Sequence, residues 1–377
     1  MARKLKSDKL LFTATLLLVC TSVVMVYSAS AVYAMDKFHQ PTLFLFKQAT
    51  WALLGFVLLP LVMRIDYRNY RQPFVIWTLL GLVTIALAAV LLGPRINGAR
   101  RWFGVAGVIG VQPSELAKIV VIVFVAALLE RRMDRIDEPS YSLLPIGLAV
   151  GLIVGLVLLE PDLGTAFCIL AIAAVMVFAA GISYRYLVGL ALVALPTMYI
   201  LVMSAPYRRR RVMAFLNPWD DPLNDGFQVI QSLIAVGTGG VFGKGLMGGV
   251  QKLFYLPEPH TDFIYSVIGE ELGLVGTTLV LLCFAVITWR GLRTAMRAPD
   301  RFGAFLALGL TAMVSVQAFL NISVVLGLVP TKGIPLPFVS FGGSSLLISM
   351  IGMGMLLNVS QQASATHIVT TALPADA

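Results

Sequence analysis

The chain has 377 residues, of which 58% are hydrophobic and only 12% are charged, and its formal net charge at pH 7 is +9. A soluble domain carries about 25% charged residues, so this composition excludes an ordinary soluble protein. The apolar residues form blocks long enough to cross a bilayer as helices, without the alternation of barrel strands. We therefore predict an all-α polytopic membrane protein that binds no nucleic acid, with basic residues that orient its spans.

The apolar blocks predict about ten transmembrane helices in a single integral membrane domain over residues 1–377. The first block follows a basic segment, residues 1–9, and is longer than the hydrophobic part of a signal peptide, so we expect it to be retained. The blocks lie at residues 10–33, 48–63, 73–92, 114–130, 143–160, 163–181, 186–204, 263–289, 304–328 and 344–360.

Lys and Arg residues predict the orientation of these spans. They concentrate at the helix ends that share a side with the N-terminus, which places the tails 1–9 and 361–377 in the cytoplasm. The long segment 205–262, between the seventh and eighth helices, is then extracytoplasmic. Its apolar residues favour a packed loop over disorder, with a short helix at Gln228 to Val236 and a glycine-dense turn at Gly237 to Gly249.

Asp262 is the sharpest candidate for a functional residue, because it stands where the eighth span begins. It could cap that helix, or act as a general base whose pKa is tuned by partial burial, and the two roles are compatible. Gly269 and Gly273 lie on nearly the same helical face and predict a close approach by another helix. Glu270 and Glu271 are either buried carboxylates that hold helices together or catalytic groups.

Further charged residues share the outer side with Asp262. Glu115 and Lys118 are spaced to pair on one helix face, as a structural ion pair or as a substrate contact. Arg101 and Trp102 precede them, either as an interfacial anchor or as a contact to an anionic head group. Together they suggest a site for an anionic, membrane-tethered ligand, to which the same side adds Glu160, Asp162 and Lys332.

Six motifs, in this order, resemble the SEDS family (shape, elongation, division and sporulation), represented by FtsW and RodA. The resemblance covers about Leu10 to Ser360 and is strongest to the division branch. In a few places the chain departs from the family pattern, as at Pro259 where Ala is common, but no charged motif residue is lost. The motifs are NGARRWF (97–103), QPSELAK (112–118), EPDLGTA (160–166), FLNPWDDPLNDGFQVIQSL (215–233), YLPEPHTDFIYSVIGEELG (255–273) and PLPFVSFGGSS (335–345).

This resemblance implies a ten-helix SEDS fold and a peptidoglycan glycosyltransferase that polymerises lipid II, with a lipid-linked nascent glycan as donor. It implies that Asp262 is the essential catalytic acid. It also implies that a further set of residues binds substrate or borders its cavity: Glu258, His260, Trp102, Arg101, Glu115 and Lys118.

The resemblance also implies partners and a location. We expect a class B penicillin-binding protein and other divisome proteins as partners, in the inner membrane at the division septum. No cofactor is certain and no metal ligand is identified, although a divalent cation (Mg or Mn) could neutralise a leaving pyrophosphate. An elongation polymerase like RodA, a lipid II flippase and a non-catalytic division scaffold remain alternatives.

Overall fold

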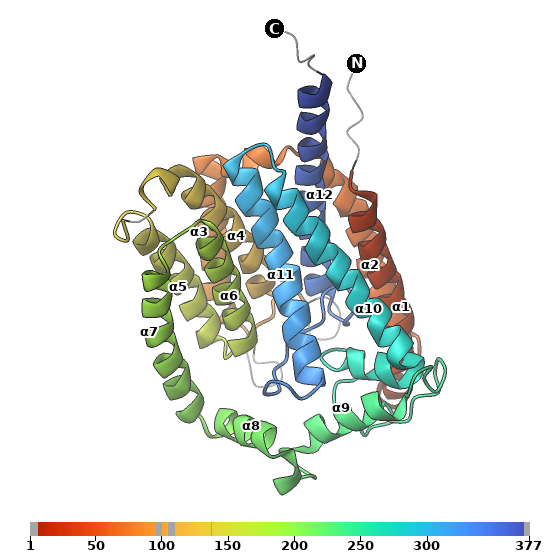
Figure 1. Ribbon diagram of the computed structural model, residues 1–377. Coiled ribbons are helices and arrows are strands. Elements are labelled where there is room, and N and C mark those ends of the chain that lie inside the picture. Colours follow the sequence, from red (N-terminus) through yellow and green to blue (C-terminus); the bar gives the residue numbers. More distant parts are fainter. Residues whose placement is uncertain (1–6, 95–99, 105–109, 137, 373–377) are drawn as a thin grey trace.

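The computed structural model describes residues 7–94, 100–104, 110–136 and 138–372, and within them ten helices run along one bundle (Figure 1). These ten helices correspond one by one to the predicted spans, which confirms the predicted fold class. They are α1 (Lys9–Phe38), α2 (Leu43–Arg64), α3 (Pro73–Val90), α4 (Pro113–Arg132), α5 (Leu143–Leu159), α6 (Leu163–Ala179), α7 (Tyr184–Met203), α10 (Ile264–Met296), α11 (Arg301–Val325) and α12 (Gly343–Ala372).

The length and composition of these helices define a multi-pass membrane protein. Six of the described helices are long and apolar enough to cross a membrane, namely α1, α2, α3, α10, α11 and α12. Helices α5, α6 and α7 contain shorter apolar stretches. Helix α4 is more polar because it begins with Glu115 and Lys118 and ends with basic residues. The start of α1 and the end of α12 lie at the same end of the bundle, as an even number of spans requires (Figure 1).

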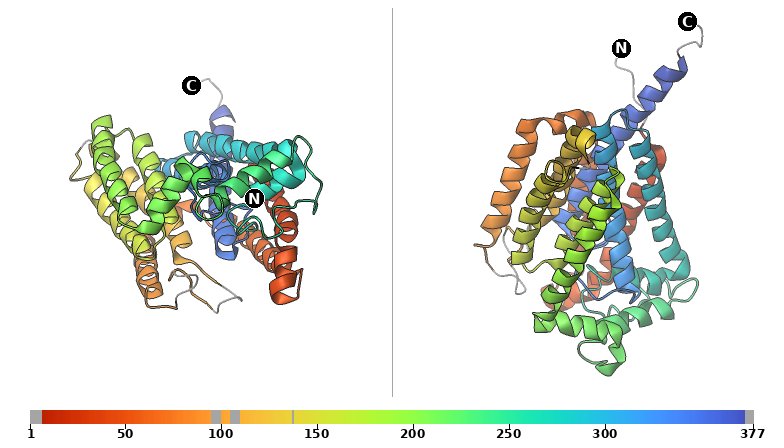
Figure 2. Two further views of the ribbon diagram at one scale, coloured as in Figure 1. Left: turned by 90° about the horizontal axis from the view of Figure 1, so that it is seen from below. Right: turned by 60° about the vertical axis from the view of Figure 1, so that its left-hand side comes forward.

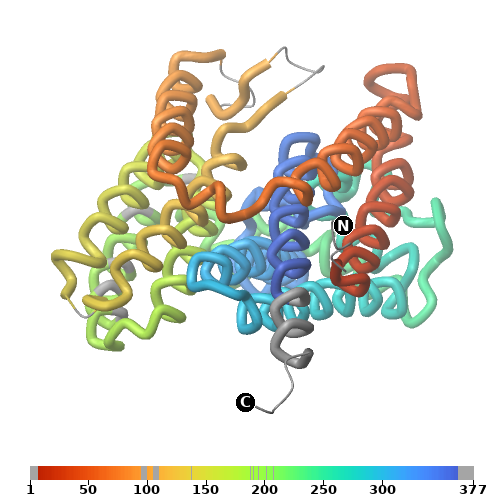
Figure 3. The backbone as a smooth tube through the Cα atoms, turned by 90° about the horizontal axis from the view of Figure 1, so that it is seen from above, coloured from red at the N-terminus to blue at the C-terminus, as the bar shows by residue number. Residues whose placement is uncertain are grey.

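Helices α4 and α11 form the centre of the bundle. Nearly every residue of α4 from Pro113 to Leu129 is buried, and α11 is buried over most of its length. The middle of α4, from Ile119 to Leu129, is apolar on all sides, as expected for a helix in such a central position. Seen along the bundle, α11 and α12 separate a group containing α1, α2 and α10 from a group containing α3 to α7 (Figures 2 and 3).

The long segment 205–262 lies across the end of the bundle opposite the termini (Figure 1). It contains α9 (Phe227–Thr238), which confirms the short helix predicted there and packs against α10, where Ser232 and Ser266 share a hydrogen bond at 2.7 Å. It also contains α8 (Pro206–Leu216), which was not predicted because its four consecutive Arg residues give it no apolar face. The segment therefore covers that end of the bundle as a packed layer.

Candidate active site at the outer ends of α4, α10 and α11

Asp262 lies in the turn that leads into α10. The helix begins at Ile264 with Phe263 as its N-cap residue, and no side chain makes a capping hydrogen bond there. The prediction that Asp262 caps this helix is therefore wrong, because the turn continues to Phe263, which takes the N-cap position instead. The turn starts at Glu258, whose carbonyl accepts a bond from the Thr261 backbone N–H at 3.2 Å. The Asp262 side chain is half-buried, and its carboxylate makes no capping bond to the helix.

The pKa of Asp262 suits a proton acceptor at neutral pH. Burial, aided by the negative charge of Glu258, raises the pKa of the Asp262 carboxyl from its ordinary value to about 7. Arg211 and Arg101 oppose this rise, and Asp162 adds to it, so charges from three separate segments reach the same carboxylate. An acid whose pKa lies near the working pH is the most effective general base.

Glu258 and His260 flank this turn in different surroundings. Glu258 is exposed and has a φ of 50°, a left-handed conformation that a non-glycine residue adopts at a cost of about 1–3 kcal/mol. His260 is buried, and its ring lies 4.8 Å from the centre of Phe44 and 5.7 Å from that of Phe341. Burial lowers the pKa of His260 to about 4, which keeps the ring neutral. Contact between His260 and substrate therefore stays a prediction.

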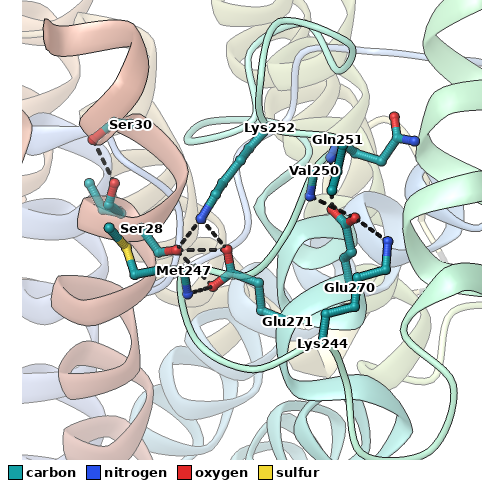
Figure 4. A network of polar contacts seen from close by, with 10 residues as sticks. Ser28, Ser30, Lys244, Met247, Val250, Gln251, Lys252, Glu270 and Glu271 are labelled. Carbon is teal, nitrogen blue, oxygen red and sulfur yellow. Dashed lines mark hydrogen bonds and ion pairs between the residues drawn. The ribbon is translucent and has the colours of Figure 1, made fainter.

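Two buried glutamates anchor the loop that precedes the turn (Figure 4). Glu271 forms an ion pair with Lys252 at 2.6 Å, and both side chains are essentially inaccessible to solvent. It also accepts bonds from Ser28 of α1 and from the backbone N–H of Met247. Glu271 therefore joins α1 to α10 and the loop, which is the first of the two roles predicted for it.

The neighbouring Glu270 holds the same loop at a second point. It pairs with Lys244 at 2.8 Å and accepts backbone N–H bonds from Val250 at 2.9 Å and Gln251 at 3.0 Å (Figure 4). Two buried carboxylates thus bind the loop to the first turns of α10.

Helix α10 is interrupted at Gly273, which has φ 65° and ψ −160°. The carbonyls of Glu270 and Glu271 lose their helical partners there and accept bonds from the N–H groups of Lys244 and Gly245, at 2.9 and 3.0 Å. On the other side of the break, the N–H groups of Leu274 and Val275 donate to carbonyls of the same glycine-dense turn, at 2.9 and 3.1 Å. The turn therefore replaces the missing helical bonds, which a buried backbone requires.

The break corrects one prediction about the glycines of α10. Gly269 does meet another helix, because a side chain there would contact Val236 of α9 at 3.3 Å. Gly273, in contrast, adopts the positive φ of the break, and a side chain there would clash with backbone atoms of Val241 and Gly243 in the inserted turn. Its function is conformational, as is usual for a glycine in this region.

Glu115 and Lys118 form the predicted ion pair at the outer end of α4. Their charged atoms lie 2.9 Å apart, and both side chains are 3–4% exposed. Lys118 also donates to the amide oxygen of Gln317 on α11 at 2.7 Å, and Gln317 donates to the carbonyl of Pro335 at 2.9 Å. The pair is thus tied to the last outer loop, while direct contact with substrate stays a prediction.

Arg101 is bound to the turn between α5 and α6. Its guanidinium donates to the carbonyls of Glu160 at 3.0 Å and Pro161 at 2.6 Å, and lies 3.9 Å from Asp162. Asp162 caps α6 through the N–H of Thr165 at 3.1 Å. Glu160 is fully buried, and burial, together with the charge of Asp162, raises the pKa of its carboxyl to about 8. Arg101 therefore positions this turn and keeps part of its charge exposed.

Trp102 and Lys332 are the remaining predicted residues of this site. Trp102 is half-buried and its ring covers Gly110. Asn97 to Ala99 of the same motif lie outside the described residues. Lys332 is half-buried over the ring of Phe167, with its amine 5.1 Å from the ring centre, and burial lowers its pKa. The predicted residues thus come together from the outer ends of α4, α6, α10 and α11.

Two side chains of α11 were not predicted and nevertheless join these parts. Gln317 links Lys118 to the last outer loop, and Asn321 donates to the backbone carbonyl of Asp262 at 2.8 Å. Both are amides within an apolar span and lie four residues apart, on one helix face. Polar residues so placed in a transmembrane helix usually indicate a functional site, and this signal was available in the sequence.

A separate cavity of about 450 Å³ lies beneath α8, lined by Arg209, Arg210, Asp220, Asp221 and Asp225 among others. It is lined by none of the candidate residues. Among the described residues, no cluster of three or more His, Cys, Asp and Glu side chains could hold a metal ion. Asp262 and Glu258 supply at most two carboxylates on the exposed side, which is a poor set for a tightly bound divalent cation.

Fold and site together define a multi-pass helical membrane protein with an acid-centred site on the face opposite its termini. The family model of the FtsW, RodA and SpoVE cell cycle proteins matches residues 8–365, and the chain belongs to this family. It is 45% identical to a probable peptidoglycan glycosyltransferase FtsW of Geobacter sulfurreducens, over 94% of this chain and 95% of that one. It is 43% identical to the stage V sporulation protein E of Bacillus subtilis, over 95% and 98%.

Solved structures show the same architecture. A chain of a peptidoglycan synthase complex, solved in a study of how polymerisation and crosslinking are coordinated, superposes with a TM-score of 0.78 at 35% identity, covering 95% of this chain and 99% of that one. The rod shape determining protein RodA of Thermus thermophilus superposes with a TM-score of 0.70 at 30% identity, covering 95% and 97%. The SEDS resemblance drawn from the motifs is thereby confirmed.

Proposed function

We propose that this protein is a peptidoglycan glycosyltransferase that polymerises lipid II into glycan strands during septal cell-wall synthesis. The observation that carries the proposal is the position of Asp262, a half-buried carboxylate on the outer face whose pKa is raised to about 7. The 45% identity to a probable peptidoglycan glycosyltransferase FtsW supports the reaction class. Fold likeness alone would not, because one fold hosts many activities.

In the proposed reaction, the 4-hydroxyl of the acceptor sugar attacks the anomeric carbon of the lipid-linked donor. Asp262 accepts the hydroxyl proton as the new C–O bond forms. The bond from the anomeric carbon to the lipid pyrophosphate breaks, and its electron pair leaves with the pyrophosphate. A single in-line displacement of this kind inverts the anomeric carbon.

The leaving pyrophosphate requires positive charge nearby. Arg101 and Lys332 are half-buried cations on the same face, whereas Lys118 already has Glu115 as its partner. Trp102 and Glu258 are proposed to contact the sugars, since both keep exposed surface. A divalent cation stays a prediction, and no step of this mechanism passes through one, because the described carboxylates do not form a cluster for it.

The proposed setting is the inner membrane at the division septum, with both termini in the cytoplasm. The proposed partners are a class B penicillin-binding protein, which would crosslink the new strands, and other divisome proteins. The likeness to a chain of a peptidoglycan synthase complex supports a partner of this kind. The excess of Arg and Lys at the end that carries the termini supports the orientation.

The test is polymer formation by the purified protein in detergent, where no membrane separates two compartments. We expect glycan strands on a gel when lipid II is supplied, with the transpeptidase partner present. A flippase or a scaffold would give no polymer under these conditions. Depletion in cells distinguishes a division role, which predicts filaments, from an elongation role, which predicts rounded cells.

A further inference from the structure

Asn321 joins the turn that carries Asp262 to the last outer loop. The residue lies near the outer end of α11, and its side chain is 1% exposed. Its amide nitrogen donates to the carbonyl of Asp262 at 2.8 Å and to the carbonyl of Ile334 at 2.7 Å. An amide nitrogen has two N–H bonds, and both are used here. One side chain therefore fixes two backbone segments, 59 and 13 residues away along the chain, relative to each other.

The residue before Ile334 faces the carboxylate of Asp262. A Cβ atom placed on Gly333 would lie 3.1 Å from Oδ2 of Asp262, so only the missing side chain keeps this space open. The φ of Gly333 lies outside the left-handed region, and the residue is exposed. Neither backbone strain nor core packing requires glycine at this position. The open space beside the Asp262 carboxylate is the feature that requires it.

The rest of the turn is held from the same side. The carbonyl of His260 accepts the N–H of Phe341 at 2.9 Å, and the carbonyl of Thr261 accepts the hydroxyl of Ser340 at 2.5 Å. With the bond from Asn321, three successive carbonyls receive donors from α11 and the last outer loop. Every donor is neutral, so these three hydrogen bonds position the backbone without adding charge beside Asp262.

We propose that Asn321 is a positioning residue for the glycosyl transfer. Its amide sets the position of the Asp262 carboxylate relative to the backbone at Gly333, and the acceptor hydroxyl binds beside the carboxylate, next to the side of Gly333 that carries no side chain. This inference rests on the proposed role of Asp262 as proton acceptor. A displacement of about 1 Å between a catalytic group and a reacting atom can reduce a rate about a hundredfold.

The chain provides a matched control at the opposite end of the bundle. Asn358 of α12 is also buried, and its amide joins two backbone groups, donating to the carbonyl of Met63 at 2.7 Å and accepting the N–H of Tyr67 at 3.0 Å. Asn358→Ala removes the same chemistry far from Asp262. A loss of activity through general destabilisation alone would affect both variants equally.

The experiment measures kcat, KM for lipid II and unfolding temperature for Asn321→Ala, Asn358→Ala and Gly333→Ala in the purified complex with the transpeptidase partner. We expect Asn321→Ala to lower kcat about tenfold or more with KM nearly unchanged, and Asn358→Ala to lower the unfolding temperature similarly with kcat unchanged. Gly333→Ala should keep the native unfolding temperature and lose at least about tenfold in kcat/KM, because its methyl group fills the acceptor space.

The inference is overturned if Asn321→Ala and Asn358→Ala have equal kcat, or if Asn321→Ala raises KM alone, which would make Asn321 a ground-state contact. Should Asn321→Ala fail to fold, Gly333→Ala decides, and a wild-type rate for it overturns the inference as well. Asp262→Asn separates the two proposals. Normal polymerisation by Asp262→Asn refutes the role of Asp262, whereas an inactive Asp262→Asn with a fully active Asn321→Ala refutes only the role of Asn321.

Discussion

Replacing Lys252 by Met tests whether the buried ion pairs below the active-site turn hold the outer loop in place. Lys252 and Glu271 are 3% and 0% exposed and lie 2.6 Å apart, and methionine keeps the length of the apolar stem while removing the charge. The Glu271 carboxylate would then be buried with only Ser28 and the Met247 N–H as donors. Removal of one partner from such a pair costs about 3–5 kcal/mol.

Lys244→Met is the matched comparison. Lys244 lies 2.8 Å from Glu270, but its side chain is 34% exposed, so water already screens the pair. Glu270 also keeps two backbone donors, Val250 and Gln251. The expected loss is therefore about 1 kcal/mol, in the range of exposed ion pairs.

The assay is equilibrium unfolding of the purified protein in mixed detergent micelles, followed by helix content. In addition, the double variant Lys252→Met with Glu271→Gln should cost less than the sum of the two single variants, because no unpaired charge then stays buried. Equal losses for Lys252→Met and Lys244→Met would refute the reasoning, since burial would then not determine the strength of these pairs.

Three further predictions concern the turn and its neighbours. The rate of polymerisation should rise with pH and level off above about 7, because burial raises the pKa of Asp262 to about 7 and the base must be ionised; a rate independent of pH between about 5 and 9 would contradict this. Because this pKa is raised above its unfolded value, the native protein should lose stability as pH rises from about 4 to 7, and Asp262→Asn should lose less, as unfolding at a series of pH values would show. His260→Phe should keep its rate within about twofold in the same polymerisation assay, because the buried neutral ring packs among aromatic side chains; a large rise in KM would instead indicate direct contact with substrate.

The helical architecture was predictable because each span corresponds to one continuous run of apolar residues. A block of about 20 apolar residues needs no distant partner to be recognised as a span. The same holds for Glu115 and Lys118, whose spacing of three places them on one face of α4, and whose charges are 2.9 Å apart in the structure. Helix α8 escaped prediction for the opposite reason, since its Arg-rich sequence carries no apolar period.

The break in α10 could not be predicted from local pattern. Gly273 continues the helical sequence of its neighbours, and its positive φ is stabilised by bonds to a turn about 30 residues earlier in the chain. Nothing in the residues around Gly273 specifies that partner. The glycine-dense turn was recognised, but the sequence gives no sign that its backbone completes an interrupted helix.

The candidate site was predicted through its charged residues and missed through its neutral ones. Asp262, Glu258 and Arg101 are conspicuous in an apolar chain. Two neutral side chains were missed: Asn321, which donates to the backbone of Asp262, and Gln317, which joins Lys118 to the last outer loop. Hydrogen bonds from an amide to backbone carbonyls depend on tertiary placement rather than on spacing. The charged residues of the site were therefore predicted, but the neutral residues and the geometry were not.

The most direct test of the proposed mechanism is the rate of lipid II polymerisation by Asp262→Asn, purified with its transpeptidase partner and compared with the wild type. Asparagine has nearly the same shape as aspartate and cannot accept the proton. We predict that the variant folds, unfolds at a temperature no lower than that of the wild type at pH 8, and forms no detectable glycan strands. Strands formed at the wild-type rate would contradict the assignment of Asp262 as the base.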